Sequence, residues 1–550
     1  MSPAPLQQGL PTQLPPSFEK RVIRDSDWAA EEDDTLRVRL VTGAEVRIGG
    51  TSGIDFTQKF SNQKGSSTMW LHALEPLRRA GEVVRQGHSE HLTALLQGWE
   101  AAVAHLSGPQ GTARLAGLPS MDHAAATRIR TCLEAGELVE DATLRQGIRG
   151  VADETVAWVL DDANYRPNNH GLMSSIALLH WHVSVERIEG GSRALDTALA
   201  RIVDLAGMSF DERGMCNENT IGYHNFNLHC YREILRVQDA EQISSTIDQQ
   251  LRPILDRAQE ALELAMLQDG TIPTLGDSGK YRPAVGRSRN RSSAFPESGL
   301  GLYKSERLYV SLVGGARTEI HKHADDTALT VHRDGAALLV DAGSYLYDRT
   351  DPFRRAMEST LGHCVIVPQD HDGQLRQQFI REHPQYEAGL LHHDVSADGA
   401  CRMAVEIRLP ERFHITRSVS VSEDRWIVVK DEVRLHPLTE SAAARQRWLL
   451  GPDLHLHQIA ADSWEASRDG APAVSLHFVG SAETETYRGE EFGQHRGWAS
   501  EAYAAKHPVS GIDRLGMGSV QVHRTLIDAA DSPALSLAEV PAAVLEDLYA

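Results

Sequence analysis

The spacing of apolar residues changes once along this chain, near residue 295, and this change limits what the chain can fold into. Before it, apolar residues recur at intervals of three and four, which is the spacing of an amphipathic helix face. After it, they alternate in short runs separated by tight turns, which is typical of antiparallel strands. A run of helices followed by a run of strands predicts separate domains.

The helical stretches are separated by short Gly, Pro and Asn breaks, so we expect stacked antiparallel hairpins and not one coiled coil. They include residues 89–106, 153–162, 172–188, 194–208, 226–237 and 253–270. At 550 residues the chain is long enough for two or three domains. We predict a flexible Pro- and Gln-rich lead-in at 1–24, a helical domain at 25–293 and an antiparallel β domain at 294–550.

Composition excludes several classes of partner. The net charge of -21 argues against nucleic acid or an anionic membrane as the main partner. No window approaches the ~18 consecutive apolar residues of a membrane span. The amino terminus lacks the basic-then-apolar layout of a secretory signal, and the five cysteines are scattered without a CxxC pair. We therefore expect a cytoplasmic protein without a disulfide framework.

One segment, residues 280–291 (KYRPAVGRSRNR), breaks the acidic trend, and we call it the basic loop. It contains five basic residues and no acid: Lys280, Arg282, Arg287, Arg289 and Arg291. It is either a solvated basic loop or a site that captures an anionic substrate, because arginine binds carboxylate and sulfate bidentately. Its position at the expected domain junction, where clefts commonly form, favours the second interpretation.

Two polar stretches stand at the start of expected helices. Asn168, Asn169 and His170 are explained either as a capping sequence, since Asn is a favoured N-cap, or as a functional set. Tyr223 and His224 follow a polar loop, and a tyrosine there is either a packing residue or an acid/base group. For work as a base, positive neighbours would have to lower the tyrosine pKa from its ordinary value near 10.

A third stretch has the pattern of a metal site. His321 and His323 are two residues apart, so on a strand they would project from the same face. A hairpin with an RDG turn would return Asp341 close to His323, and His363 opens the next apolar run. Two imidazoles and one carboxylate suit zinc with one position left over, although a lone HxH is otherwise typical of surface or core histidines.

Six motifs carry a resemblance to a known family. The sequence resembles the heparinase II/III-like polysaccharide lyases, which include oligoalginate lyases, from about residue 65 to at least residue 370. The motifs are NNHGL (168–172), ENTIGYHNFNL (218–228), DGTIPTLGDS (269–278), HKHADD (321–326), VDAGSYLYD (340–348) and LGHCVIV (361–367). The resemblance implies an α/α toroid followed by an antiparallel β-sandwich, and cleavage of uronic-acid-containing glycans by β-elimination to 4,5-unsaturated products.

The resemblance also implies roles for individual residues. Asn169 and His170 would contact the uronate carboxylate, and Tyr223 and His321 would transfer protons. A structural Zn²⁺ would be held by His323, Asp341 and His363. For substrate binding we add the arginines of the basic loop, Arg287, Arg289 and Arg291.

The chain departs from the family pattern at two of these places. Cys364 follows the last zinc histidine, where the family commonly has Asn, and Met173 stands where some members have a glutamate.

Two other functions remain open at this point. A glycoside hydrolase on an α/α toroid would need two carboxylates flanking a sugar bond; Glu218, Asp277 and Asp325 are available, but the sequence does not pair them. A non-catalytic glycan-binding or exopolysaccharide-associated protein could keep the same fold. In each case we expect an anionic, uronate-containing oligosaccharide or polysaccharide as the partner.

Overall fold

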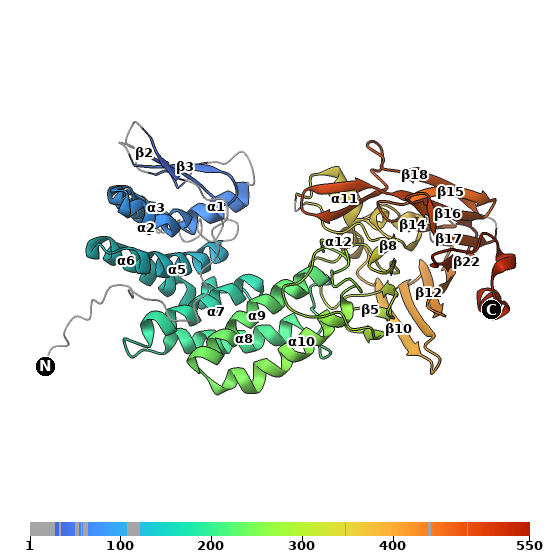
Figure 1. Ribbon diagram of the computed structural model, residues 1–550, viewed down its shortest axis with the longest axis horizontal. Coiled ribbons are helices and arrows are strands. Elements are labelled where there is room, and N and C mark those ends of the chain that lie inside the picture. Colours follow the sequence, from blue (N-terminus) through green and yellow to red (C-terminus); the bar gives the residue numbers. More distant parts are fainter. Residues whose placement is uncertain are drawn as a thin grey trace. The chain divides into compact units, whose positions relative to one another are not determined.

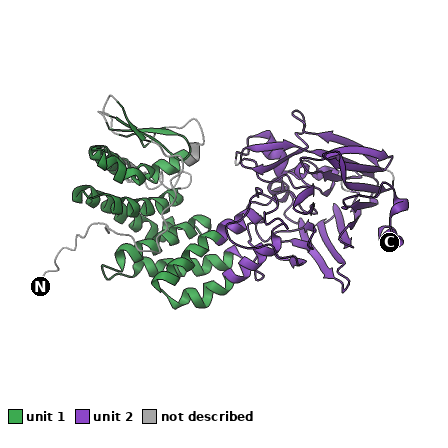
Figure 2. Cartoon of the chain, viewed as in Figure 1, with its two compact units in different colours: residues 1–208, 229–254 green, residues 209–228, 255–550 purple. Residues whose placement is uncertain are grey.

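A computed structural model of the chain describes residues 28–31, 35–49, 54–56, 58, 64–106, 121–346, 348–437, 442–480 and 482–550. The predicted lead-in at 1–24 lies outside the described residues. The chain divides into two compact units (Figure 2). The helical unit comprises residues 1–208 and 229–254, and the β unit comprises residues 209–228 and 255–550. The predicted domain boundary between residues 293 and 294, which follows the change from helix to strand, stays a prediction.

In the first half of the chain, the described helices are α1 (Lys64–His72), α2 (Ala80–Arg85), α3 (Ser89–Leu106), α5 (Met121–Leu138), α6 (Ala142–Leu160), α7 (Asn169–Trp181), α8 (Arg193–Ser209), α9 (Ile221–Glu241) and α10 (Arg252–Ala265). Each of the six predicted helical stretches overlaps a helix of the structure, with longer bounds for α6, α8 and α9 and shorter bounds for α7 and α10. Within the helical unit, α5 packs against both α6 and α7 and is buried along almost its whole length (Figure 1). Among the described residues, no helix combines the length and apolar character needed to cross a bilayer.

The helical unit also contains a small antiparallel sheet that the sequence did not predict. Its strands are β1 (Trp28–Ala30), β2 (Thr35–Arg39) and β3 (Glu45–Gly49), paired in that order. In β2 and β3 buried and exposed residues alternate, with Leu36, Val38, Val46 and Ile48 inward. The prediction of helices alone in this part of the chain is therefore wrong for these three short strands.

The β unit consists of antiparallel sheets, as predicted. A five-stranded sheet has the order β4-β5-β6-β7-β8, an eight-stranded sheet the order β10-β11-β12-β13-β22-β17-β16-β15, and a four-stranded sheet the order β18-β21-β14-β9. The bounds are β4 (Ser293–Phe295), β5 (Leu300–Lys304), β6 (Leu308–Val313), β7 (Leu329–Arg333), β8 (Ala336–Leu339), β9 (Ile366–Pro368), β10 (Glu387–Val395), β11 (Cys401–Leu409), β12 (Phe413–Ser422), β13 (Trp426–Leu435), β14 (Ala443–Leu449), β15 (His455–Ala460), β16 (Ser463–Arg468), β17 (Ala471–Val479), β18 (Glu483–Arg488), β19 (Trp498–Ala502), β20 (Ala505–Pro508), β21 (Ser510–Met517) and β22 (Val520–Asp528). The unit also contains the start of α9, most of α10 and the short helices α11 (Pro352–Glu358), α12 (Arg376–Glu382) and α13 (Ala542–Tyr549).

One apolar core joins these sheets, and it includes Leu308, Val331, Val405, Val429 and Trp448 from five different strands. Sheets that share a core in this way form a sandwich. The strand β12 contributes one face to this core, because every second residue along it is buried.

Candidate active site and metal centre

Tyr223 lies in the first turn of α9, in the part of that helix that belongs to the β unit. The Thr220 hydroxyl accepts a hydrogen bond from the Tyr223 amide at 3.0 Å and so caps the helix. The segment that contains Ser278 approaches α9 closely at Gly222, whose amide donates a hydrogen bond to Ser278 Oγ at 2.9 Å. A Cβ at position 222 would lie 3.3 Å from Ser278 Cα, so a side chain there would push residues 277 and 278 away.

His321 does not lie on a strand, contrary to our expectation. It sits in the loop between β6 and β7, with a φ of 54°, a left-handed conformation that residues other than glycine seldom adopt. The loop is held by Asn219, whose side-chain amide donates to the carbonyls of Thr318 and Ile320, both at 2.8 Å. The imidazole of His321 stacks on the Tyr223 ring, with centroids 3.7 Å apart and planes inclined by 20°.

Asp277 connects His321 to His323. One of its oxygens, Oδ2, lies 3.1 Å from His321 Nδ1, and the other, Oδ1, lies 3.1 Å from His323 Nε2. Arg354 from α11 donates to the same two oxygens at 3.0 and 2.5 Å. Burial alone would raise the pKa of Asp277, but the charge of His323 and the hydrogen bonds of both histidines and Arg354 lower it far below its ordinary range. Asp277 is therefore an ionised carboxylate.

The other nitrogen of His321 faces a second carboxylate. Glu218 Oε2 lies 3.5 Å from His321 Nε2, and the amide of Asn227 donates to Glu218 Oε1 at 2.7 Å. His321 thus has an acceptor at each ring nitrogen while one face of the ring is covered by Tyr223. His224, in contrast, is a core histidine: it is buried, lies 2.8 Å from the Ala258 carbonyl through Nε2, and accepts from the Cys216 amide through Nδ1.

The structure brings the three expected zinc ligands together. His323, Asp341 and His363 are buried, and one ligand atom of each lies within 4.8 Å of the others. The β7–β8 hairpin returns Asp341 as expected, with its turn at Asp334 and Gly335, which both have positive φ. We call these three residues the metal cluster.

Two orphaned nitrogens show that the metal cluster fits a cation. His323 Nδ1 and His363 Nε2 are buried, and neither has a hydrogen-bond partner among the described residues. The opposite nitrogens are engaged, since His363 Nδ1 lies 2.8 Å from Asp341 Oδ2 and His323 Nε2 faces Asp277. A ligating histidine commonly has its second nitrogen fixed by a carboxylate outside the ligand set, as His323 has in Asp277, whereas Asp341, which contacts His363, is itself one of the three expected ligands. The residues therefore fit zinc, with four-coordination completed by one further ligand.

A second buried group, Asp277, His323 and Glu358, also lies within 4.8 Å. It is less suited to a metal ion because a cation already occupies it: Arg354 donates to both Asp277 oxygens and to Glu358 at 2.7 Å.

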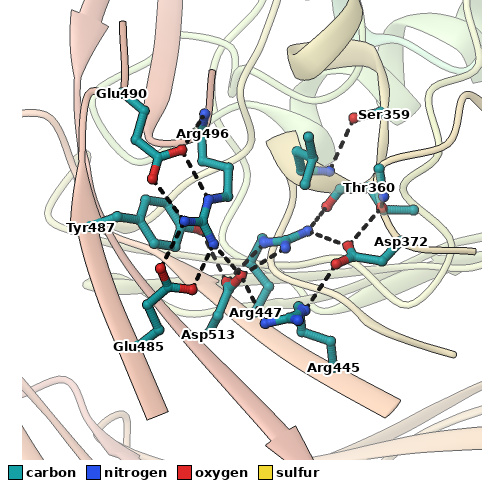
Figure 3. A network of polar contacts seen from close by, with 12 residues as sticks. Ser359, Thr360, Asp372, Arg445, Arg447, Glu485, Tyr487, Glu490, Arg496 and Asp513 are labelled. Carbon is teal, nitrogen blue, oxygen red and sulfur yellow. Dashed lines mark hydrogen bonds and ion pairs between the residues drawn. The ribbon is translucent and has the colours of Figure 1, made fainter. Parts of the chain in front are cut away.

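Buried arginines hold the segments that carry the metal cluster. Arg417, at an inward position of β12, donates to the carbonyls of Thr327 at 2.8 Å and Cys364 at 2.7 Å, and so ties the His323 loop to the His363 segment. Arg447 on β14 donates to the Thr360 carbonyl at 2.8 Å and pairs with Asp513 at 2.9 and 2.8 Å, within the network shown in Figure 3.

Asn169 and His170 lie at the start of α7, in the helical unit. Asn168 is the N-cap of this helix, and its side chain accepts from the His170 amide at 2.9 Å, so the capping interpretation holds for Asn168. His170 Nδ1 lies 3.0 Å from Asp122 Oδ1. Burial would raise the pKa of Asp122, but its interactions with His170 lower it below its ordinary value.

The basic loop is less available to an anion than its sequence indicates. Arg289 pairs with Glu263 at 2.6 Å, and Arg291 pairs with Glu260 at 2.8 Å. Both acids lie on α10. Arg287 is exposed, and no described acidic residue forms an ion pair with its guanidinium.

Sequence reasoning missed Asp277 and Arg354 as members of this site. Asp277 was considered only as a hydrolase carboxylate, although it belongs to the DGTIPTLGDS motif. Arg354 cannot be assigned to the site from the sequence, because it lies outside the motifs and is separated from Asp277 by 77 positions.

Comparisons with known proteins concern the fold of the chain. Residues 287–525 match the family model "Heparinase II/III-like, C-terminal". No curated protein matches the chain in sequence.

Several solved structures share the fold. A heparinase III structure aligns over 90% of this chain and 81% of its own, with 12% identity and a TM-score of 0.71. A heparan sulfate lyase, HepC, from Pedobacter heparinus aligns over 88% of this chain and 79% of its own, with 13% identity and a TM-score of 0.62. A heparinase III gene product aligns over 87% and 81%, with 13% identity and a TM-score of 0.65. At these identities the likeness shows the fold, and the predicted toroid followed by a β-sandwich is confirmed. Residues 287–525 are thus similar to the C-terminal domain of heparinase II/III-like proteins, and the chain shares the fold of the heparinase III structures.

Proposed function

We propose that the protein is a lyase that cleaves uronic-acid-containing oligosaccharides or polysaccharides by β-elimination. The observation that carries the proposal is the stacked pair of Tyr223 and His321, whose orientation is fixed by Asp277 and Asn219. Two proton-transfer groups side by side suit a reaction that removes one proton and delivers another.

The chemistry of a uronic acid explains why such groups are needed. Its C5 proton is weakly acidic because it lies next to the carboxylate, and its removal spreads negative charge into that carboxylate. Elimination then breaks the bond to O4 and forms a C4–C5 double bond, and the departing O4 takes up a proton. No water is added, so the product is a 4,5-unsaturated sugar.

Neutralising the carboxylate is the largest electrostatic task, and preorganised donors perform it best. For this task we propose Asn169 and His170, by the resemblance described above. Asp122 Oδ1, 3.0 Å from His170 Nδ1, orients the imidazole of His170. Of the basic loop, we propose Arg287 as the arginine available to bind the substrate, since Arg289 and Arg291 are paired with glutamates.

For the proton transfers we propose Tyr223 and His321. Tyr223 would serve in succession as base and acid where the C5 proton and O4 lie on one face of the sugar. His321 would be the base where they lie on opposite faces. Glu218, 3.5 Å from His321 Nε2, is placed to share a proton with that nitrogen.

A bound zinc would supply structural support, because its ligands join the His323 loop, the β7–β8 hairpin and the His363 segment. A hydrolase is less well supported. Asp277 is tied to Arg354, and Asp325 is buried against Lys322, so neither is available as an acid or a base for a sugar bond.

The test is ultraviolet absorbance from a new conjugated enoate. Wild type, Tyr223→Phe and the control Tyr549→Phe would be incubated with heparan sulfate, chondroitin, hyaluronan and alginate oligosaccharides. Tyr549 is an exposed tyrosine at the end of α13, outside the proposed site. We expect absorbance from wild type and from the control, and a loss of about 10²-fold or more in Tyr223→Phe, because a proton-transfer group typically contributes 10²–10⁴-fold. Undiminished activity in Tyr223→Phe would remove Tyr223 from the chemistry.

A further inference from the structure

The β unit contains an open hollow that the proposed function does not use, and we call it the edge hollow. It lies between the loop that precedes α9, the helix α10 and the strands β4 and β10, and its lining residues all belong to the β unit. Its volume of about 700 Å³ is within the range of small-molecule binding pockets. Neither Tyr223 nor His321 nor any residue of the metal cluster lines it.

One part of the lining is cationic. Three arginines, Arg213, Arg257 and Arg291, stand there against two glutamates, Glu212 and Glu260. Glu260 is paired with Arg291 at 2.8 Å, whereas no described acidic residue forms an ion pair with Arg213 or Arg257. Two exposed guanidiniums are thus available to a ligand, in a chain whose net charge is -21. Because arginine binds carboxylate bidentately, this part of the lining suits an anion.

The loop that carries Arg213 is held in place by its neighbours. Asp211 is buried and accepts a hydrogen bond from the Arg213 amide at 2.9 Å. The Arg213 guanidinium donates to the carbonyl of Ala294 on β4 at 2.7 Å. A Cβ at Gly214, whose φ is 87°, would lie 2.4 Å from the carbonyl carbon of Arg257, so only glycine allows the loop to approach α10 this closely. The backbones of Arg213 and Arg257 are therefore fixed side by side.

A second part of the lining lies on β10 and is aliphatic. It includes Leu391 and Val395, whose exposed fractions are 49% and 50%. Cations together with exposed aliphatic side chains suit an anion that is attached to an apolar surface. A uronic acid has both features, because it carries a carboxylate on a ring with an apolar C–H face. A free phosphate or sulfate ion would fill little of the volume and would leave the aliphatic side chains without a contact.

The strands β4 and β10 add hydrogen-bonding groups to the lining. Each is the edge strand of its sheet, so its backbone N–H and C=O groups on one side face no other described strand. β4 has only three residues, and the register of β10 shifts between Leu390 and His392. Short or bulged edges pair poorly with an added strand. They offer single donors and acceptors, which suit sugar hydroxyls better than an extended peptide.

We propose that the edge hollow is a second binding site for the uronate glycan, with a lining distinct from the Tyr223–His321 pair. The two exposed arginines bind the carboxylate, the aliphatic residues of β10 contact the sugar ring, and the strand edges bind the hydroxyls. Arg291 of the basic loop belongs to this site, although it is paired with Glu260. The choice of a uronate glycan rests on the proposed function, whereas the anionic and partly apolar character of the ligand rests on the lining residues alone.

The experiment locates bound glycan by hydrogen–deuterium exchange of the full-length chain. Tyr223→Phe is the background, so that the glycan is not consumed, and hexasaccharides of heparan sulfate, chondroitin, hyaluronan and alginate are the probes. Peptides that cover 291–296 and 387–395 report the edge hollow, and peptides that cover 218–228 and 316–323 report the proposed active site. With at least one probe at a roughly tenfold excess over Kd, we expect exchange at the edge hollow to slow about tenfold, because a bound ligand stabilises by the factor 1 + [L]/Kd.

Two variants test the lining residues. Arg257→Gln changes an exposed side chain, and we expect affinity at the edge hollow to fall by about tenfold or more while protection of 218–228 stays. Val395→Glu places a negative charge beside the ligand and should also weaken binding there. The matched control is Arg402→Gln, because Arg402 is an arginine on β11 with a 72% exposed side chain outside the edge hollow. This control should bind as the background does.

Four results would overturn the proposal. They are no protection of the edge hollow by any of the four glycans, equal protection by a neutral cello-hexasaccharide, protection by polyglutamate but by none of the glycans, and unchanged affinity in Arg257→Gln.

The failure of the proposed function looks different. If wild type forms no enoate from any of the glycans while one of them still protects the edge hollow and Arg257→Gln weakens that protection, the lyase assignment fails and the second site stands. If enoate forms and depends on Tyr223 while the edge hollow is never protected, the lyase assignment stands and the second site fails.

Discussion

The backbone conformation of His321 lowers local stability but orients the imidazole. A residue other than glycine in a left-handed conformation costs on the order of 1–3 kcal/mol and persists only where its surroundings determine it. Here the surroundings are Asn219, which holds the preceding carbonyls, Asp277 at one ring nitrogen and the Tyr223 ring at one face. The strain is therefore compensated by contacts that also aim the imidazole.

The metal cluster gives a prediction at the same scale. We expect the wild-type chain to contain one zinc per molecule and His363→Ala to contain none, because the variant removes one of the three expected ligands. Metal that binds the folded state stabilises it, by about 2.7 kcal/mol at a hundredfold excess over Kd, so the variant should melt at a lower temperature. Metal analysis and thermal melting, with and without a chelator, would measure both effects.

His371→Leu is the control for this prediction. His371 is also buried in the β unit, and burial lowers its pKa to about 4, so it is a neutral core histidine outside the metal cluster. We expect His371→Leu to contain as much zinc as the wild-type chain. Equal zinc in wild type and His363→Ala would contradict the metal assignment.

The individual residues of the site were predictable to very different degrees. His323, Asp341 and His363 come together as the hairpin argument expected, because a short turn fixes register over a few residues. The strand expected for His321 was wrong, because alternation in a six-residue polar stretch does not distinguish a strand from a loop. Arg354 was not predictable, since its contact with Asp277 depends on tertiary packing alone.

At the scale of secondary-structure elements, β12 does more than complete a sheet. Its inward residues are apolar except for Arg417, which is fully buried and pairs with Asp431 of β13 at 2.7 and 2.8 Å. The same guanidinium donates to the carbonyls of Thr327 and Cys364, so one strand supports the His323 loop and the His363 segment.

Arg417→Met tests this support. We expect the free energy of unfolding to fall by about 3–5 kcal/mol, because Asp431 would remain buried without its cation. Zinc affinity should also fall, since the two carbonyls lose their donor. Denaturant unfolding and zinc titration would measure the two effects separately.

The double variant Arg417→Met/Asp431→Leu separates the ion pair from the support. Removing both charges should recover much of the stability, because a buried pair replaced by apolar residues is often neutral. It should not recover zinc affinity. Recovery of both would show that Arg417 has no role in holding the metal cluster.

The spacing of apolar residues was the most reliable indication of secondary structure in the sequence. Period-two alternation predicted the strands of the β unit, and the helix starts near residues 89, 194 and 253 agree with α3, α8 and α10. The sheet β1–β3 was not predicted, because three short strands beside a long helical pattern show little alternation of apolar and polar residues.

At the scale of the whole molecule, the net charge and the expected substrate have the same sign. A chain with a net charge of -21 repels a uronate glycan at long range, so affinity must come from local cations and oriented donors. The change from helix to strand predicted the fold that the chain shares with the heparinase III structures, whereas the resemblance, and not the charge, pointed to the substrate class.

The measurement that tests the central claim most directly counts two products of the wild-type reaction at once: new reducing ends and new conjugated enoates. Elimination creates one enoate for every bond broken, so the two counts should rise together at a ratio of one. Reducing ends that accumulate without enoate would mean that water enters the product, and the lyase mechanism proposed here would be wrong.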